Sequence, residues 1–219
     1  MKLVSIIDYG CGNIRSVFNA FNAIKEKKNI KILVTNNEKD IKKSNFLVLP
    51  GVGSFESCIK GLIKSNLLDI ISFKVNDNGI PFLGICVGCQ LLLSRGEEFG
   101  PNVGLDLIPG VVSRLPAPRI GDPDAIRIPN VGWRPLSVRC DAPILGQVAP
   151  EDWMYFVHSY APMVDDPANI SATIAFNGQD IPVAISRDNI FGVQFRPERS
   201  GPSGLRLLAQ FLEAKMEFI

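Results

Sequence analysis

The segment Ile80-Pro-Phe-Leu-Gly-Ile-Cys-Val-Gly88 decides how the chain folds around its most reactive side chain. Its apolar run at 80–85 predicts a strand, and a helical pattern follows from about Val87. At this junction Gly84-Ile-Cys-Val-Gly88 has the pattern G-x-C-x-G, the thiol version of a nucleophile elbow. Two glycines allow a sharp turn that lifts the Cys86 sulfur off the sheet, and the N-terminus of a helix lowers a thiol pKa. The pattern favours a cysteine nucleophile over a buried structural cysteine in a tight turn.

The first half of the chain alternates short apolar runs with helical patterns. Because the apolar runs lack polar alternation, they indicate strands of a parallel sheet that is covered on both faces. The expected strands before residue 80 are 3–8, 31–35 and 46–50, and the expected helices are 14–27, 54–65 and 66–76.

The second half has a different pattern. Residues 100–150 are rich in Pro and Gly without a strong helical pattern, so we expect turns and antiparallel excursions at a sheet edge. Close-spaced strands are expected at 153–158, 171–176, 181–186 and 190–195, followed by a closing amphipathic helix at Gly204–Glu217. Since no repeat, low-complexity tract or linker is visible, we predict one α/β domain over residues 1–219.

Composition excludes several classes of function. A net charge of +1 gives no sign of the excess of basic residues that binding to nucleic acid or an anionic membrane requires. No apolar run approaches the roughly 18 residues that span a bilayer, and the N-terminus enters a strand without the regions of a signal peptide. The five cysteines are odd in number and irregularly spaced, which argues against a disulfide framework and for a reducing cytoplasm. Cys86 and Cys89 form C-x-x-C without a second ligand pair, so we expect no metal site.

Two further glycine motifs follow predicted strands. In Leu49-Pro-Gly-Val-Gly-Ser54, backbone N–H groups could point at an anionic oxygen as an oxyanion hole, and an ordinary glycine turn is the alternative. Asp8-Tyr-Gly-Cys-Gly-Asn13 contains G-x-G, but Arg15 occupies the place where a dinucleotide fingerprint needs its third glycine. We therefore expect no nucleotide cofactor.

The general base is the missing part of this site. A cysteine nucleophile normally pairs with a histidine that a carboxylate orients. His158, the only histidine, is flanked by hydroxyl residues at a strand end and is predicted to be a hydrogen-bonded structural or substrate-edge residue. The stretch FGVQFRPERS at 191–200 instead delivers Arg196 and Glu198 to the same side of a strand end. An arginine cannot act as a base, because its pKa stays above about 12.

The order of these motifs resembles that of the class I glutamine amidotransferases, and within them the glutaminase subunits of imidazole glycerol phosphate synthase. The resemblance covers nearly the whole chain, and the first and fourth motifs separate this subfamily from its anthranilate, GMP and carbamoyl-phosphate relatives. It implies a flavodoxin-like α/β fold with a mostly parallel central sheet, helices on both faces and an antiparallel edge. The six motifs are DYGCGNIRSV (8–17), PGVGSF (50–55), GICVGCQ (84–90), IPNVGW (128–133), YFVHSY (155–160) and GVQFRPERSG (192–201).

The resemblance also implies roles for single residues. Cys86 falls on the nucleophile of a Cys–His–Glu triad, Glu198 on its carboxylate, and Arg196 on its histidine. The remaining matches are the oxyanion strand, Gly51, Val52 and Gly53, and the residues that hold glutamine, Gln90, Glu98, Ser159 and Tyr160. No cofactor is implied. Members of the family make ammonia from glutamine and pass it to a partner (βα)₈-barrel synthase in histidine biosynthesis, so a heterodimer is expected.

The chain departs from the family pattern at four positions. Arg196 replaces the base, and Cys89 stands for a usual methionine. Asn130 replaces a usual histidine and Arg134 a usual asparagine, in a segment that by analogy faces the partner. With Arg196 we expect glutamine turnover to be abolished or severely reduced, with the glutamine pocket still formed.

Four alternatives remain open at this point. The chain could be a working glutaminase in which His158 or water replaces the base, or a catalytically silent subunit that keeps the barrel active. A paralogue that supplies ammonia for surface-sugar amidation is a third alternative. A γ-glutamyl hydrolase or peptidase of the same fold fits the motifs beyond the elbow less well.

Overall fold

An eight-stranded sheet forms the centre of the protein, whose computed structural model describes residues 1–118, 121, 125–139 and 144–214. The strand order is β2-β1-β3-β4-β14-β13-β12-β9. The first five strands in this order are parallel to one another, and β13, β12 and β9 continue the sheet with antiparallel pairing. This confirms the predicted α/β class with an antiparallel edge. The strands are β1 (Lys2–Ile7), β2 (Ile30–Thr35), β3 (Phe46–Gly51), β4 (Phe82–Cys86), β9 (Ser137–Val138), β12 (Ile170–Phe176), β13 (Gln179–Arg187) and β14 (Ile190–Val193).

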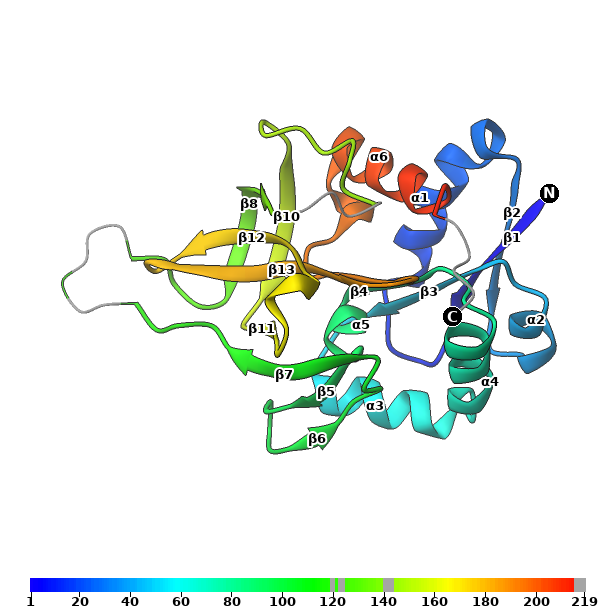
Figure 1. The fold of residues 1–219 in the computed structure, drawn as a ribbon, viewed down its shortest axis with the longest axis horizontal. Helices are drawn as coiled ribbons and strands as arrows, with labels where there is room; N and C mark the ends of the chain where they lie inside the picture. The colour runs from blue at the N-terminus through cyan, green and yellow to red at the C-terminus, as the bar shows by residue number, and fades with distance from the viewer. Residues whose placement is uncertain (119–120, 122–124, 140–143, 215–219) are drawn as a thin grey trace.

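Helices cover both faces of this sheet (Figure 1). α1 (Ile14–Lys28) and α6 (Gly201–Phe211) pack together on one face, and α3 (Phe55–Lys64) and α4 (Leu68–Ser72) lie on the other. The remaining helical elements are α2 (Glu38–Lys42), a π-helical turn (Phe73–Asp77) after α4, α5 (Val87–Gln90) and the short 3₁₀ turns at Pro167–Asn169 and Pro197–Arg199. Within the described ranges, no helix is long and apolar enough to cross a membrane.

Two smaller sheets face the carboxyl ends of β3 and β4. β8 (Asn130–Pro135) pairs with β10 (Trp153–His158) as an antiparallel ribbon. A four-stranded sheet has the order β11-β7-β5-β6. Its strands are β5 (Leu93–Gly96), β6 (Asn102–Val103), β7 (Ile108–Arg114) and β11 (Tyr160–Val164). Figure 1 shows both small sheets on the side of the molecule where α5 begins.

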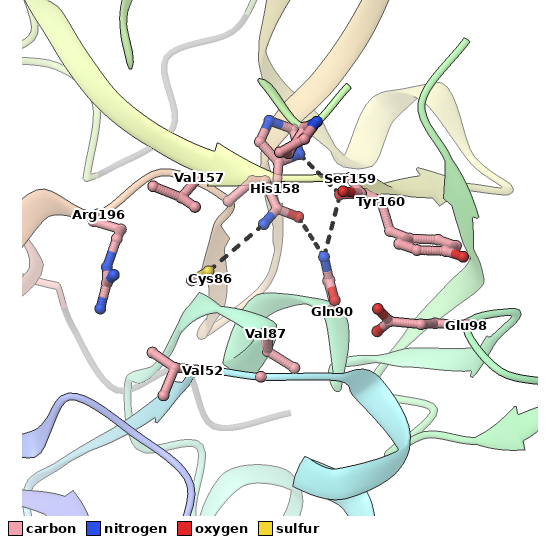
Figure 2. Close-up of a pocket in the computed structure, with 13 residues that line it drawn as sticks. Val52, Cys86, Val87, Gln90, Glu98, Val157, His158, Ser159, Tyr160 and Arg196 are labelled. Carbon is pink, nitrogen blue, oxygen red and sulfur yellow. Dashed lines mark hydrogen bonds between the residues drawn. The ribbon is translucent and has the colours of Figure 1, made fainter. Parts of the chain in front are cut away.

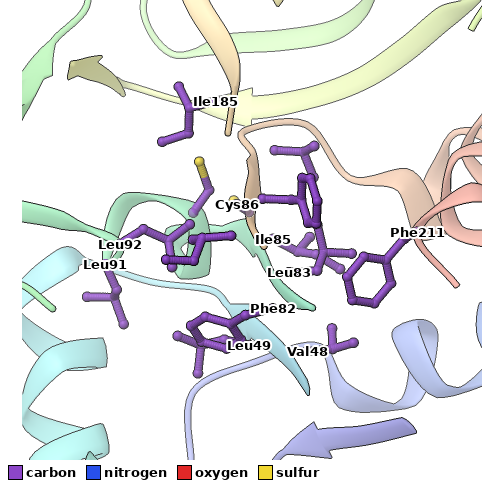
Figure 3. Packing of buried hydrophobic residues seen from close by; sticks show 14 of the residues in the cluster. Val48, Leu49, Phe82, Leu83, Ile85, Cys86, Leu91, Leu92, Ile185 and Phe211 are labelled. Atoms are coloured by element: carbon purple, nitrogen blue, oxygen red, sulfur yellow. The ribbon is translucent and has the colours of Figure 1, made fainter. Parts of the chain in front are cut away.

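The strands that carry the site run through the centre of the core. Val48 and Leu49 on β3 and Leu83 and Ile85 on β4 are almost completely buried, directly below Cys86 (Figure 3). Since core side chains pack at crystal-like density, this environment holds the end of β4 in place.

Several element predictions need correction. The helix predicted from residue 87 is only the four-residue α5, because Leu91, Leu92 and Leu93 are completely buried and lead into β5. Antiparallel strands were predicted at the sheet edge for 100–150, and among the described residues of this range only β9 joins the central sheet. β7 and β8 belong to the smaller sheets, and β5 pairs with β7 in parallel. Strand β11 was not predicted. The closing helix starts at Gly201 and ends at Phe211, and its predicted residues 215–217 lie outside the described residues.

Candidate active site

Cys86 occupies a strained turn between β4 and α5. Its backbone has φ 57° and ψ −113°, a combination that residues with a side chain rarely adopt. Such strain persists only where the surroundings determine it, and here β3 and β14 flank β4 on both sides. The predicted strand–turn–helix junction is therefore present, although its helix is short.

Close contact between main chains explains the two glycines of the elbow. A Cβ at Gly88 would lie 1.8 Å from the carbonyl oxygen of Leu49, and a Cβ at Gly84 would lie 2.5 Å from the carbonyl oxygen of Gly88. Because the obstructing atoms belong to the backbone, a side chain at either position would force the strands or α5 to move.

A cavity of about 240 Å³ opens beside the Cys86 thiol (Figure 2). Its floor comes from the ends of β3 and β4, and its opposite wall comes from the ends of β10 and β11. Arg196 and Glu98 lie on opposite sides of it (Figure 2). The lining residues are Val52, Gly53, Cys86, Val87, Gln90, Glu98, Pro129, Val157, His158, Ser159, Tyr160, Gln194 and Arg196.

The structure brings most of the predicted site residues to this one cavity. Gly51 and Glu198 are the exceptions, since neither lines it. Gly51 pairs with Cys86 across β3 and β4, and the Glu198 side chain lies behind Arg196 with 1% of its surface exposed. The predicted residues that line the cavity are Cys86, Arg196, Val52, Gly53, Gln90, Glu98, Ser159 and Tyr160.

Polar groups are fixed on the side of the cavity opposite Arg196. The Glu98 carboxylate accepts a hydrogen bond of 2.8 Å from the backbone N–H of Phe55, at the start of α3. The Gln90 side-chain amide donates to the Tyr160 carbonyl at 3.2 Å. Glu98 is the only acidic side chain among the lining residues, so it suits the ammonium group of an amino-acid substrate whose other end reaches Cys86.

Two backbone amides are candidates for the oxyanion hole. The Cys58 thiol donates to the Val52 carbonyl at 3.4 Å. Because C=O and N–H point in opposite directions in a trans peptide, the N–H of Gly53 is directed away from Cys58. The backbone N–H of Val87 hydrogen-bonds to the Cys86 thiol. Both amides thus belong to residues that line the cavity.

Arg196 and Glu198 form an ion pair at the edge of the cavity. The Arg196 Nε lies 3.0 Å from Oε1 of Glu198, and the two side chains are 13% and 1% exposed. Oε2 of Glu198 is buried, with no hydrogen-bond partner among the described residues. Burial raises the pKa of Glu198, and the Arg196 cation opposes that effect. The Arg196 guanidinium is therefore paired with the Glu198 carboxylate, whose negative charge has few other partners.

Burial also controls the Cys86 thiol. It raises the pKa of Cys86 to about 11, whereas the Arg196 cation and the Val87 amide lower it and Glu198 raises it further. The protonated thiol is therefore the resting form at neutral pH. The expected lowering by the helix N-terminus is present through the Val87 amide at the start of α5, but desolvation outweighs it, so the pKa of Cys86 as a whole is raised.

His158 has both ring nitrogens in hydrogen bonds away from Cys86. Nε2 lies 2.9 Å from the side-chain nitrogen of Asn130, and Nδ1 lies 2.8 Å from the Tyr160 carbonyl oxygen. Burial lowers the pKa of His158 to about 4, so the ring is neutral at neutral pH. This agrees with the predicted hydrogen-bonded structural or substrate-edge role.

Sequence reasoning missed Gln194. It is completely buried, its Oε1 accepts from Gln90 at 2.9 Å, and its Nε2 lies 3.9 Å from the Cys86 sulfur. One signal was available, because Gln194 is a polar residue inside an apolar run, two residues before Arg196. Pro129 also lines the cavity and was not predicted.

Comparisons with known proteins identify the family of the chain. The family model for glutamine amidotransferase class-I matches residues 5–214. The imidazole glycerol phosphate synthase subunit HisH of Geobacter sulfurreducens is 41% identical over 98% of this chain and 100% of its own length. The HisH subunit of Salinibacter ruber is 38% identical over 95% of this chain and 93% of its own.

Solved structures share the fold at low sequence identity. A glutamine amidotransferase from Thermotoga maritima superimposes with a TM-score of 0.60 at 16% identity, over 97% of this chain and 81% of that chain. A second structure described as a glutamine amidotransferase gives a TM-score of 0.68 at 17% identity, over 96% and 97%. With the family match and the full-length relatives, the chain belongs to the class I glutamine amidotransferases.

Proposed function

We propose that this chain is the glutamine amidotransferase subunit of an imidazole glycerol phosphate synthase, serving histidine biosynthesis. The observation that carries the proposal is the placement of Cys86. Its thiol stands at a strained elbow and opens onto a cavity lined by the residues expected to hold glutamine. Relatives that are 37–41% identical over nearly the whole chain and are named as HisH support the choice of subfamily.

In the proposed reaction, the Cys86 sulfur attacks the amide carbon of glutamine and forms a C–S bond. The N–H groups of Gly53 and Val87 are the proposed donors to the oxygen that gains negative charge. The C–N bond then breaks, and the departing nitrogen must gain a proton to leave as ammonia. Water next attacks the thioester and must lose a proton, which releases glutamate and restores the thiol. The last two steps both need a group that can transfer a proton.

Arg196 can assist only the first step, the attack by the Cys86 sulfur. Its cation lowers the pKa of Cys86 and so favours the attacking thiolate. A guanidinium that stays protonated can neither give its proton to the departing nitrogen nor accept one from water. General acid–base catalysis contributes about 10²–10⁴-fold to a rate. We therefore expect the glutamine pocket to be intact and turnover to be severely reduced.

The decisive experiment measures glutamate release in the presence of the partner subunit. Arg196→His should raise turnover by about 10²–10⁴-fold, because an imidazole can transfer protons at neutral pH. Arg196→Gln is the matched control, since it removes the cation without adding a proton carrier, and it should not raise turnover. Cys86→Ala sets the background. Equal turnover of the unaltered chain and Arg196→His would contradict the proposed role of residue 196.

An exposed apolar surface beside the cavity supports a partner. We call it the ribbon face, and it consists of Val131, Trp133, Trp153 and Val157 on β8 and β10, exposed at 56%, 48%, 52% and 38%. Apolar patches of this kind mark sites of protein association. Val157 also lines the cavity. We propose that the (βα)₈-barrel synthase subunit docks here, so that ammonia released at Cys86 passes to it directly.

The Arg196–Glu198 ion pair favours one second candidate, a catalytically silent subunit. In that case the chain would hold the barrel subunit in its active state, and the barrel would use free ammonia. Synthase activity driven by ammonium salts would rise on adding the chain, and Cys86→Ala would not alter that rise. The glutaminase proposal instead predicts that glutamine-driven product formation, however slow, disappears with Cys86→Ala.

A further inference from the structure

A row of hydrogen bonds connects the β8–β10 ribbon to the wall of the cavity. The Arg134 Nε donates to Oδ1 of Asn130 at 2.6 Å. The Asn130 side-chain nitrogen lies 2.9 Å from Nε2 of His158. Nδ1 of His158 lies 2.8 Å from the carbonyl oxygen of Tyr160, a residue that lines the cavity.

The chemistry of the end groups sets the direction of each bond. Since the Arg134 Nε can only donate, it occupies the Asn130 carbonyl and leaves the NH₂ group facing His158. That NH₂ group can only donate, so Nε2 of the ring must accept. The Tyr160 carbonyl can only accept, so Nδ1 must carry the hydrogen. Both ends of the row therefore require the same neutral, Nδ1-protonated form of His158.

Because the central side chains of this row are buried, the loss of any one of its hydrogen bonds would be costly. Asn130 is completely buried and His158 is 6% exposed. An unpaired donor or acceptor there would lose its hydrogen bond without gaining water. Arg134 is half-buried, and its guanidinium lies 5.7 Å from the ring centroid of Phe176. This contact holds the guanidinium on the inner side of β8, whereas the neighbouring Trp133 is on the ribbon face.

At the cavity, the row continues to the nucleophile. The Tyr160 carbonyl also accepts the hydrogen bond from Gln90, which donates in turn to Gln194. The amide nitrogen of Gln194 lies 3.9 Å from the sulfur of Cys86. Figure 2 shows Gln90 and Tyr160 on the same side of Cys86. The Tyr160 carbonyl therefore connects the hydrogen bonds that start at Arg134 with those of Gln90 and Gln194 beside the Cys86 thiol.

We propose that Arg134 is a positioning residue for the glutamine site. From the ribbon it orients the Asn130 amide, and the amide holds the His158 ring in the form that fixes the Tyr160 carbonyl and the Gln90 side chain. The inference rests on the proposed function, because it treats the cavity as the glutamine site. It assigns a role to one of the four positions at which the chain departs from its family.

The first test uses the fact that the chain contains a single histidine. In the tag-free protein, ¹⁵N NMR of labelled histidine should report a protonated Nδ1 and an Nε2 that accepts a hydrogen bond. Arg134→Met should shift the Nε2 signal, and Arg134→Lys, which keeps a donor, should restore it. Trp133→Ala, next to it but on the ribbon face, is the matched control and should leave the signal in place. A protonated Nε2 in the unaltered protein, or an unshifted signal in folded Arg134→Met, overturns the inference.

The second test measures the affinity for glutamine by calorimetry in a Cys86→Ala background, where no turnover interferes. Adding Arg134→Met should raise the Kd for glutamine about tenfold, as expected for one misplaced hydrogen bond in the pocket wall. Arg134→Lys should stay close to the parent value. If the Cys86→Ala protein does not bind glutamine, the proposed function fails together with the inference. If it binds glutamine and Arg134→Met binds it equally well, only the inference fails.

Discussion

At the scale of single residues, the reactivity of Cys86 depends on a balance between burial and two opposite charges. Burial raises the thiol pKa to about 11, Arg196 lowers it and Glu198 raises it. The thiolate is the form that reacts with an alkylating reagent. The pH dependence of alkylation therefore reports this balance without requiring any turnover.

We expect the alkylation rate of Cys86 to rise about tenfold per pH unit from pH 7 to pH 10 and to level off near pH 11. Arg196→Met removes a cation that favours the thiolate, so it should move the curve to higher pH. Glu198→Gln removes a charge that disfavours the thiolate, so it should move the curve to lower pH. Peptide-resolved mass spectrometry separates Cys86 from the partly exposed Cys11. A plateau at neutral pH would show that the thiol is not controlled by burial.

Sequence reasoning located the site residues but not their energetics. Cys86 was predicted from its motif, Gln90 and Glu98 from the family resemblance, and the structure places all three at one cavity. The raised pKa of Cys86 was not predicted, because it depends on how completely the surrounding chain excludes water. Gln194 was missed for a related reason, since only the fold shows that its amide lies beside the sulfur.

At the scale of elements, the elbow depends on the distance between α5 and β3. We expect Gly88→Ala to lower the free energy of unfolding by about 3 kcal/mol, because its Cβ would lie 1.8 Å from a backbone oxygen. Gly146→Ala is the matched control. Its Cβ would meet only the end of the Gln210 side chain, at 3.0 Å, so the loss should stay below about 1 kcal/mol. Urea unfolding followed by circular dichroism measures both, and equal losses would contradict the packing argument.

Helices and strands could be predicted from the sequence where the local pattern of apolar and polar residues determines them. The inner strands β3, β4 and β14 are buried on both faces, so their apolar runs appear in the sequence as continuous segments such as Phe46–Gly51. The length of α5 and the pairing of β5 with β7 were not predictable in this way. Leu91–Leu93 could continue a helix or enter a strand, and long-range packing beneath β7 decides between the two.

At the scale of the whole molecule, the site lies where the central sheet meets the smaller sheets. Cys86 comes from the end of β4, whereas Val157 and Tyr160 come from the ends of β10 and β11. A class I fold with this arrangement positions its nucleophile at the carboxyl ends of parallel strands and leaves the opposite wall to the ribbon. A partner that binds the ribbon face therefore touches the same element that carries Arg134 and, through Val157, the cavity itself.

Association through the ribbon face leads to a prediction about single side chains. Trp133 is 48% exposed and its ring packs against Tyr155 at 5.7 Å between centroids, so it presents a large apolar surface in a defined position. Aromatic residues of this kind contribute disproportionately to binding energy. Trp133→Ala should therefore raise the Kd for the barrel synthase by about tenfold or more, measured by calorimetry. Phe73→Ala is the matched control, because Phe73 is 45% exposed but lies on the turn after α4, in a different part of the molecule. This variant should bind the barrel synthase with an unchanged Kd. If both variants bind as the unaltered chain does, the partner docks on another surface of the chain.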